Sequence, residues 1–514
     1  MLFSIWALSV LPKVFATTAP TLTGFEKNVH WEPCLDPKIP IFCANLSLPV
    51  DWNKPDGEHF DLFMSKIAAK KQDAKIGNLF FNPGGPGASP GKELQKSDIA
   101  PYSYNYWNHN PLTDHFDFIA IDPRGTGNSR PVLCDPKVWR KETRYFPQTE
   151  DEFHRLKSQL EAMGQSCYNQ TGDWLRYIDT ASSAKDIEAV RIALGDEPMS
   201  FLGISYGTQL GAQYAELFPG NIRAMVLDSV LDHSELDPFD SWVRESAGYE
   251  EFAEGFFDWC EGAGSSCVLS GVDNLPAWFD NLVDRLNEQP IEFLSPEPCD
   301  GDPIDCGNRL YGDKVTGKLA GFIASPNAGP TWQETASHLA MLESRGTPGR
   351  FQETRRHEGN SSQTWSFVAI LCADAISDQT KPDYATIRER VEYARSTFPH
   401  TRGNNGSWTR LMFCPFWPVP SNNPPHEITA FKDGTSKFAT PILIVNAYQD
   451  PLTRYDAAIN VQRQFGDANA VLLSRDGFGH ISESFPGAVS DAIYDYLINL
   501  KVPAHGTVLK NLGL

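Results

Sequence analysis

Short segments that are apolar along their whole length constrain this chain more than any other feature. Four of them, each bounded by Gly, Pro or Asp, precede residue 230: IGNLFFN at 76–82, FDFIAI at 116–121, MSFLG at 199–203 and AMVL at 224–227. Strands that are apolar on both faces are typical of a parallel sheet that helices cover on each side. The amphipathic segment at 180–194 predicts one of those helices.

The alternation of strands and helices stops after Asp232 and returns near the C-terminus. Apolar segments reappear at 441–446 (PILIVN) and 470–474 (AVLLS), and a helix is expected near 488–500. We therefore predict one α/β core, 17–232 and 432–514, interrupted by a large, mainly helical insertion over 233–431. The alternative is two consecutive domains, but the two late strands would then form a very small, exposed sheet.

The charge of the chain argues against two classes of partner. Asp and Glu total 65 against 44 Lys and Arg, so the formal net charge is −21. A surface of that sign repels phosphate backbones and anionic lipid headgroups. We expect no nucleic-acid partner and no membrane partner.

The first 16 residues have the pattern of a secretory signal peptide. The apolar run LFSIWALSVL at 2–11 is too short to span a bilayer, and small Ala16 suits a cleavage site. A buried N-terminal strand or helix is the alternative. No second long apolar run follows and the C-terminal residues are not an apolar tail, so we expect a secreted protein without a membrane anchor.

Cysteines and glycosylation sequons support that localisation. The ten cysteines are even in number, and their spacing suggests five pairs, although sequence does not fix the connectivity: Cys34/Cys43, Cys134/Cys167, Cys260/Cys267, Cys299/Cys306 and Cys372/Cys414. No C-x-x-C spacing occurs, which argues against a zinc or redox site. Four N-x-[ST] sequons predict glycans, at Asn45, Asn169, Asn360 and Asn405.

The motif G-x-S-x-G occurs twice, at 203–207 and at 87–91, and backbone chemistry separates the two matches. A nucleophile elbow needs a strand before the serine, a helix after it, and a backbone N–H on the following residue. Ser89 is followed by Pro90, which has no N–H. Ser205 lies between an apolar strand and the helical segment 208–217, and Tyr206 supplies the amide, so we predict Ser205 as the nucleophile.

A second glycine-rich turn follows the strand at 76–82. The segment Asn82-Pro83-Gly84-Gly85-Pro86-Gly87 lies where a second donor to an oxyanion is expected, and Gly85 is the candidate because Pro86 cannot donate. A plain tight turn is the alternative. The later segment 122–129 (DPRGTGNS) is expected to shape the pocket wall, with Arg124 in a structural role.

The serine requires a base, and the base requires an acid that orients it. Asp450 follows the strand at 441–446, and His480 follows the next strand, at 470–474. One strand–helix–strand unit would bring both loops to the sheet edge that carries Ser205. Asp476 is the rival acid, but it precedes His480 by four residues on the same loop, so we predict Asp450.

These motifs together resemble the proline iminopeptidase and tripeptidyl aminopeptidase family of α/β-hydrolase serine peptidases. The resemblance covers about residues 31–232 and 410–500 and rests on five segments: Trp31-x-x-Cys34 with Cys43 and Val50-Asp51, NPGGPGAS at 82–89, DPRGTGNS at 122–129, GISYGT at 203–208, and 441–480 with Asp450-Pro451-x-Thr453 and Gly479-His480. Pro83 replaces the His usual in the prolyl enzymes, which favours the tripeptidyl side. The resemblance implies the α/β-hydrolase fold with an inserted cap.

The resemblance also implies an aminopeptidase that cleaves peptides from their free N-terminus. Carboxylates of the cap would then bind the substrate ammonium, and the candidates are Asp232, Glu235, Asp237, Glu245, Glu250 and Glu251. Acyl transfer of this kind needs no metal or organic cofactor. We expect turnover to fall as the pH drops through about 6–7, where an imidazole base takes up a proton.

Two alternatives to a peptidase remain open. The same triad would serve a secreted carboxylesterase or lactonase that acts on small esters, because the cap selects the substrate. A catalytically inactive binding module on the same fold is the second alternative. Substrate length, residue preference and oligomeric state are not predicted.

Overall fold

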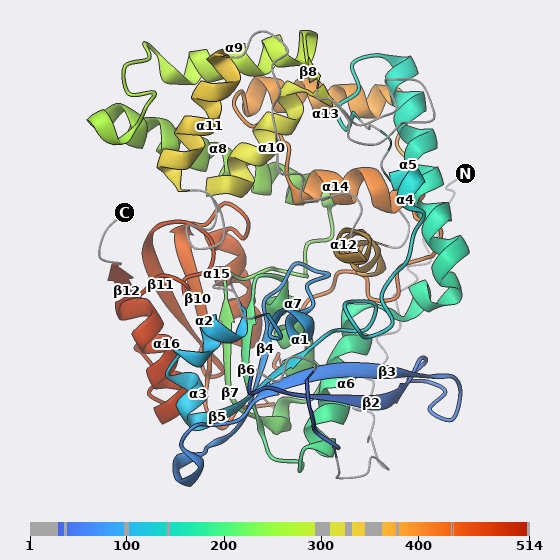
Figure 1. Cartoon of the computed structure of the whole chain (residues 1–514), viewed down its shortest axis with the longest axis vertical. Coiled ribbons are helices and arrows are strands. Elements are labelled where there is room, and N and C mark those ends of the chain that lie inside the picture. The colour runs from blue at the N-terminus through green and yellow to red at the C-terminus, as the bar shows by residue number, and fades with distance from the viewer. Residues whose placement is uncertain are drawn as a thin grey trace, which may run out of the picture.

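The fold is organised around one twisted sheet with a helical cap above it (Figure 1). The computed structural model describes residues 29–34, 39–96, 102–139, 141, 144–292, 309–323, 331–344, 362–376, 380–432, 434 and 436–510. The predicted signal peptide and the Asn360 sequon lie outside these residues.

The sheet has the order β1-β2-β3-β5-β4-β6-β7-β10-β11-β12. Its strands are β1 Glu32–Pro33, β2 Phe42–Pro49, β3 His59–Ile67, β4 Gly77–Asn82, β5 Phe116–Ile121, β6 Met199–Ile204, β7 Ile222–Asp228, β10 Ile442–Gln449, β11 Ala470–Phe478 and β12 Thr507–Lys510. All pairs from β5 to β12 are parallel, which confirms the predicted mostly parallel sheet.

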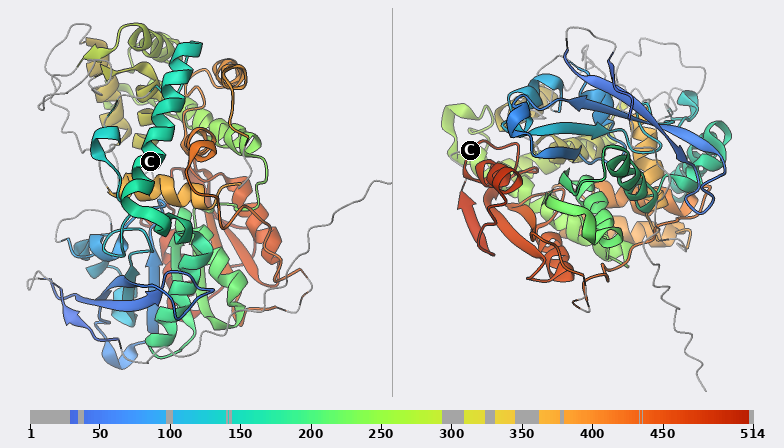
Figure 2. Two further views of the ribbon diagram at one scale, coloured as in Figure 1. Left: turned by 90° about the vertical axis from the view of Figure 1, so that its right-hand side faces the viewer. Right: turned by 90° about the horizontal axis from the view of Figure 1, so that it is seen from below.

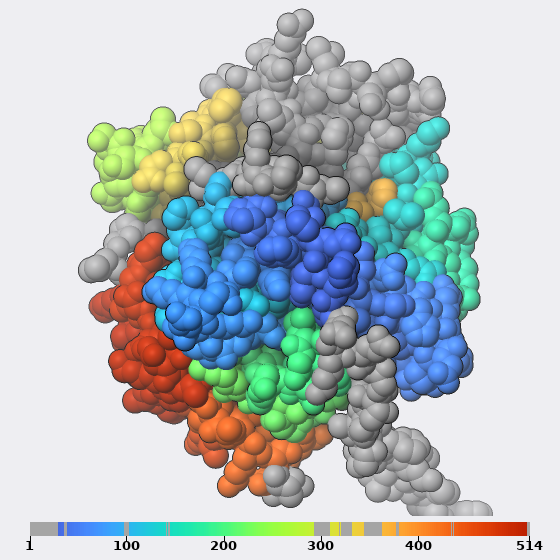
Figure 3. Space-filling view, turned by 60° about the horizontal axis from the view of Figure 1, so that its bottom comes forward, coloured from blue at the N-terminus to red at the C-terminus, as the bar shows by residue number. Residues whose placement is uncertain are grey.

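The first three strands are antiparallel and were not predicted. Exposed and buried residues alternate along β3, as expected for a strand with one solvated face. Such strands lack the continuous apolar run that identifies the central strands. Figure 3 shows the face that these N-terminal strands form, in blue, with the red C-terminal part of the core beside them.

Helices cover both faces of the sheet. The longer core helices are α5 Glu150–Thr171, α6 Thr180–Ala193, α7 Tyr206–Leu217, α15 Tyr455–Phe465 and α16 Ala488–Asn499, and the short ones are α1 Pro90–Glu93, α2 Tyr104–Asn108, α3 Leu112–His115 and α4 Pro136–Trp139. Alternate residues of β4 enter separate hydrophobic clusters, Phe80 on one face and Leu79 with Phe81 on the other. This two-sided burial explains why the central strands are apolar throughout.

The cap lies between β7 and β10, which are hydrogen-bonded neighbours in the sheet. Its helices are α8 Pro238–Gly262, α9 Leu275–Glu288, α10 Gly312–Ile323, α11 Trp332–Ser344, α12 Ser362–Ala373, α13 Tyr384–Thr397 and α14 Gly406–Phe413, with a small ladder of β8 Ile291–Glu292 and β9 Arg309–Leu310. The predicted bounds, 233 and 431, fall within the connections from β7 to α8 and from α14 to β10. Helix α5, in teal, stands beside the cap in Figure 1 and in the left view of Figure 2.

The cap consists of two parts that differ in their packing. The inner part, α12 to α14 with the first half of α8, shares a hydrophobic cluster with the core, to which Trp242, Trp365 and Trp408 belong. The outer lobe, α9 to α11 with the second half of α8 from Phe252, has a hydrophobic cluster of its own. The outer lobe is therefore a second, smaller core.

Four of the five predicted disulfides are present. They join the described cysteines in the pairs that the spacing suggested, Cys34–Cys43, Cys134–Cys167, Cys260–Cys267 and Cys372–Cys414. The fifth predicted disulfide is not confirmed, because Cys299 lies outside the described residues. Its expected partner, Cys306, lies outside the described residues as well. The bond between Cys299 and Cys306 therefore stays a prediction.

The glycosylation sequons differ in their exposure. Asn45 and Asn169 are exposed. Asn405 is only 8% exposed, and its amide donates to Ser246 while its carbonyl oxygen accepts from the Trp408 amide at the start of α14. The side-chain nitrogen to which a glycan would be attached is thus engaged by Ser246, and the glycan at Asn405 stays a prediction.

No helix in the described ranges combines the length and the apolar character needed to cross a bilayer.

Candidate active site

Ser205 occupies a strained turn between β6 and α7. Its φ of 56° and ψ of −125° lie in a region that non-glycine residues rarely adopt. A Cβ on Gly203 would lie 2.4 Å from the Gly207 carbonyl oxygen, and one on Gly207 would lie 2.4 Å from that of Asn82. The motif therefore needs glycine at both places, and Ser205 occupies the elbow that the sequence predicts.

The glycine-rich loop at 82–87 lies against the serine turn. A Cβ on Gly84 would lie 2.8 Å from the Ser205 Cβ and 2.9 Å from the Tyr206 nitrogen, so the glycine-rich loop passes directly against the elbow. Within the described ranges, neither the Gly85 N–H nor the Tyr206 N–H has a hydrogen-bond partner. Both amides are thus free to donate to a substrate oxygen.

The other G-x-S-x-G match has a different geometry. Ser89 precedes the short helix α1, and Pro90 occupies the first helical position.

Arg124 of the neighbouring motif is fully buried and forms a bidentate pair with Asp186, at 2.6 and 2.7 Å. The contacts of Arg124 are thus structural, as expected.

His480 and Asp450 meet at the ends of β11 and β10. The His480 Nδ1 lies 2.9 and 3.0 Å from the two carboxylate oxygens of Asp450, and both side chains are buried. The hydroxyl of Thr453 donates to Asp450 at 2.9 Å and lies 3.3 Å from the same imidazole nitrogen. Thr453 belongs to the segment Asp450-Pro451-x-Thr453, but nothing in the spacing of that segment predicts this contact.

Burial opposes ionisation of Asp450, but His480 and the amide and side-chain hydrogen bonds around the carboxylate outweigh it. The pKa of Asp450 is therefore lowered, which keeps the carboxylate charged beside the imidazole. The rival acid, Asp476, pairs instead with Lys510 at 3.3 Å. Asp450 is thus the acid that contacts His480.

Asp228, the last residue of β7, connects the serine turn to the histidine loop. Its carbonyl oxygen accepts from the Ser205 amide at 2.9 Å, and its carboxylate accepts from the amides of Ser482 and Glu483 at 3.1 and 2.7 Å. Burial raises the pKa of Asp228 to about 6. Asp228 therefore links the Ser205 turn to the loop that carries His480. Nothing in the sequence distinguishes it from other aspartates at strand ends.

Two further buried groups hold the histidine loop. The Ser229 hydroxyl accepts from the Ile481 amide at 2.8 Å. The Arg475 guanidinium donates to the carbonyl oxygens of Phe478 and Gly479, at 2.9 and 2.5 Å. Sequence reasoning missed both side chains because neither belongs to a recognisable motif.

The Ser205 hydroxyl has no hydrogen-bond partner among the described residues. In serine hydrolases such contacts often tighten only in the substrate complex.

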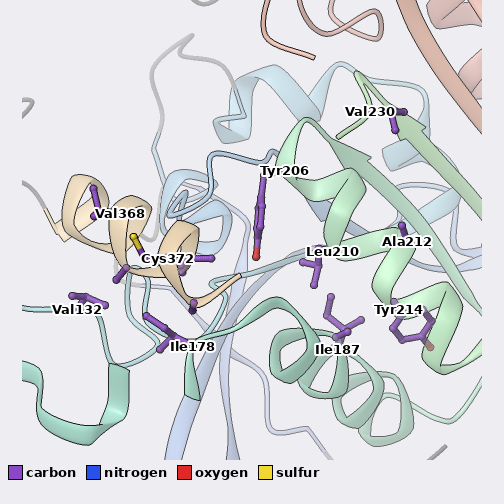
Figure 4. Packing of buried hydrophobic residues seen from close by; sticks show 14 of the residues in the cluster. Val132, Ile178, Ile187, Tyr206, Leu210, Ala212, Tyr214, Val230, Val368 and Cys372 are labelled. Carbon is purple, nitrogen blue, oxygen red and sulfur yellow. The ribbon is translucent and has the colours of Figure 1, made fainter. Parts of the chain in front are cut away.

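The inner part of the cap reaches the serine turn through a buried carboxylate. Asp374, just after α12, accepts from the Thr180 amide, the Gln209 amide and the Asn423 amide at 3.0, 3.1 and 3.0 Å. The Thr180 hydroxyl also contacts the Tyr206 hydroxyl at 2.5 Å. Burial raises the pKa of Asp374 to about 7. Figure 4 shows the Tyr206 ring in the same cluster as cap residues Val368 and Cys372.

Most of the acidic residues proposed to bind an ammonium already serve the fold. Glu245 and Glu250 accept from backbone amides at 406–407 and 400–401, Asp237 caps α8, and Glu235 pairs with Arg244. Asp232 accepts from Asn460 and Gln464. Glu251 is exposed. These contacts assign none of the six carboxylates to a substrate.

Comparison with known families agrees with this geometry. The family model described as alpha/beta hydrolase fold matches residues 77–289, and the model described as TAP-like protein matches residues 400–509. The chain has the α/β-hydrolase fold. The two matched ranges contain the Ser205 turn and the Asp450 and His480 loops of this hydrolase, respectively.

Three curated relatives are similar over most of this α/β-hydrolase. The serine protease Hip1 of Mycobacterium tuberculosis is 29% identical over 93% of this chain and 90% of that protein. The tripeptidyl aminopeptidase of Streptomyces lividans is 25% identical over 93% and 86%. Carboxylesterase B of Mycobacterium tuberculosis is 29% identical over 90% and 85%. The similarity therefore extends through both the core and the cap.

Proposed function

We propose that this α/β-hydrolase is a secreted serine peptidase that releases short peptides from the free N-terminus of its substrates. The observation that carries the proposal is the buried contact of the His480 Nδ1 with Asp450, beside a serine on a strained elbow. Similarity to a serine protease and a tripeptidyl aminopeptidase over more than nine-tenths of the chain supports the peptide substrate.

In the first step, the Ser205 hydroxyl oxygen attacks the substrate carbonyl carbon and its proton passes to the His480 Nε2. Asp450 accepts from Nδ1–H, so it fixes the tautomer and stabilises the imidazolium. The negative charge on the former carbonyl oxygen is held by the free amides of Tyr206 and Gly85. Collapse of this intermediate breaks the C–N bond, and His480 returns the proton to the departing amine.

In the second step, water replaces the departed amine. His480 takes a proton from the water, whose oxygen attacks the acyl carbon, and the same two amides hold the second oxyanion. The ester bond to Ser205 then breaks, and the serine oxygen recovers its proton from His480. The released products are a shortened chain and the peptide acid.

Peptide anilides test the proposal directly. We expect cleavage of tripeptide anilides with a free N-terminus, little cleavage of the acetylated forms, and no labelling by a fluorophosphonate after Ser205→Ala. Labelling that persists in Ser205→Ala would reject the nucleophile, and preferential cleavage of acetylated peptides would reject the exopeptidase.

A carboxylesterase is the second candidate, because Carboxylesterase B has the same sequence identity to this chain, 29%, as the serine protease has. The same acyl-enzyme steps would apply to an ester, with an alcohol leaving in place of the amine. Turnover of p-nitrophenyl esters without any cleavage of peptide anilides would favour this candidate.

Secretion is supported by the oxidised cysteines. Four disulfides join the described parts of the chain, and such bonds persist in oxidising compartments. Residues 1–16 are the proposed signal peptide, with glycans proposed at exposed Asn45 and Asn169 and a fifth disulfide proposed between Cys299 and Cys306. Mass spectrometry of the secreted protein would identify the mature N-terminus, both glycans and the state of Cys306.

A further inference from the structure

One core side chain is part of the hydrophobic cluster of the outer lobe. All other members of that cluster among the described residues lie between Phe252 and Leu342, whereas Phe478 is the last residue of β11. Phe478 stands two positions before His480. The outer lobe is therefore packed against the loop that carries the proposed base.

The Phe478 ring is seated between aromatic side chains of the lobe. Its centroid lies 5.6 Å from that of Phe252 and 5.7 Å from that of Trp332, both in edge-to-face geometry. On another side it lies against bare helix backbone, because a Cβ on Gly255 of α8 would stand 2.5 and 2.7 Å from two of its ring carbons. The glycine thus leaves a notch that the ring fills.

The backbone around this ring has unusual freedom. Gly477 and Gly479 flank Phe478 with φ values of 148° and 110°, which other residues rarely adopt. The core holds the main chain through Arg475, which donates to the carbonyl oxygens of Phe478 and Gly479, and through Gln449, which accepts from the Gly479 amide at 3.0 Å. The Phe478 ring supplies the contact with the cap at this point.

We propose that Phe478, seated in the Gly255 notch, is a positioning residue through which the outer lobe sets the location of His480. The inference rests on the proposed role of His480 as the general base. Packing of the lobe would then affect the chemical step itself, even for substrates that do not touch the lobe. Misplacement of a catalytic group by about 1 Å is enough to slow a reaction by about 100-fold.

Filling the notch tests this inference. Gly255→Ala places a methyl group where the ring lies, whereas Gly262→Ala, at the end of the same helix, adds one where nothing lies within 4 Å. Phe478→Leu removes the ring carbons that the new methyl group would meet. The readouts are kcat and KM for a peptide anilide and for p-nitrophenyl acetate, the rate of fluorophosphonate labelling, and the thermal midpoint.

We expect Gly255→Ala to lower kcat by about tenfold for both substrates, with KM nearly unchanged, and to slow labelling equally. Gly262→Ala should stay within about twofold of the wild type. Since the effect passes through the ring, adding Gly255→Ala to Phe478→Leu should produce no further loss. If Gly255→Ala does not fold, Phe478→Leu alone should show the kcat loss on both substrates.

Three results would overturn the inference. The first is full activity of Gly255→Ala. The second is a rise of KM for the peptide substrate alone, which would make Phe478 a subsite residue only. The third is an undiminished effect of Gly255→Ala in the Phe478→Leu background. Failure of the proposed function looks different, because Ser205→Ala or His480→Gln, in a protein with an unchanged outer lobe, would then retain turnover.

Discussion

The sheet core and the outer lobe of the cap hold their parts together in different ways. In the core, the loops of Ser205, Asp450 and His480 follow strands whose register is set by parallel ladders, and Asp228 joins two of these loops through polar contacts. The outer lobe is a small apolar cluster that shares one core side chain, Phe478, among the described residues.

The two kinds of contact differ in how precisely they fix the positions of groups in this enzyme. Hydrogen bonds to a buried carboxylate specify distance and direction, and a missing partner is costly. Apolar contacts are tolerant of small shifts and of volume-conserving replacement. We therefore expect the core to determine the reaction, and the outer lobe to modulate it through Phe478.

The largest expected effect tests whether Ser205, in the core, is the nucleophile. Ser205→Ala should lower kcat by about 10⁴-fold or more, because no other hydroxyl occupies the elbow. Ser89→Ala, in the second G-x-S-x-G match, is the control and should stay within about twofold of the wild type. Peptide anilide assays with both purified variants decide this, and an inactive Ser89→Ala would mean that the two motifs have been confused.

The next effect concerns the tie between the core and the inner part of the cap. Asp374→Ala would leave buried donors of Thr180, Gln209 and Asn423 without an acceptor, so we expect a loss of about 3 kcal/mol in the free energy of unfolding. The control is Asp383→Ala, an exposed cap of α13, which should cost about 1 kcal/mol. Denaturant titration measures both, and equal losses would remove Asp374 from this role.

A smaller effect tests the polar contacts within the core. Asp228→Asn places an amide group opposite the N–H groups of Ser482 and Glu483, so the histidine loop should shift and kcat should fall about 10- to 100-fold. Asp476→Asn, which disturbs only the ion pair with Lys510, should change kcat by less than about twofold. A normal kcat for Asp228→Asn, with a normal pH profile, would contradict the positioning role.

The smallest effect is the pH dependence of stability. Burial raises the pKa of Asp122 and Asp228 to about 6, and of Asp374 and Glu483 to about 7. The folded state thus binds more protons than the unfolded state between about pH 4 and 7, and stability falls as the pH rises through these values. His233, whose pKa burial lowers to about 3, acts in the opposite direction, whereas the raised pKa values of His400 and His426 add to the decrease.

We therefore expect the thermal midpoint to decrease by a few degrees from pH 5 to pH 8 at constant ionic strength. All four carboxylates lie in the core or the inner cap, so this dependence reports on those parts and not on the outer lobe. Differential scanning calorimetry measures it. A midpoint that increases with pH over this range would show that the carboxylates are ionised without penalty.

The core was predictable because its signals are local. Segments apolar on both faces identify central strands, and the G-x-S-x-G turn needs a particular strand, helix and amide order that only 203–207 satisfies. Asp450 and His480 followed from their places after two such strands. The antiparallel strands β1 to β3 escaped prediction because one-sided burial gives a weaker pattern.

The polar supports of the site were not predictable in the same way. Asp228, Ser229 and Arg475 contact the histidine loop across 250 residues or at a strand end, and nothing local marks them. The cap carboxylates show the converse difficulty, because five of the six proposed for substrate are engaged by the fold. Long-range partners have to be seen in three dimensions before a charged residue can be given a role.

The chain leaves the sheet for the cap at the end of β7 and re-enters it at β10. These two strands are neighbours in the sheet, with Leu443 opposite Val226. Because β7 and β10 are parallel, the chain leaves one strand at its carboxyl end and enters the other at its amino end, so the two attachment points lie on neighbouring strands but towards opposite ends of them. A segment anchored in this way can be lengthened, shortened or exchanged between homologues without disturbing the ladder beneath it. Recombination at these two points would diversify what the enzyme accepts while its reacting groups stay in place.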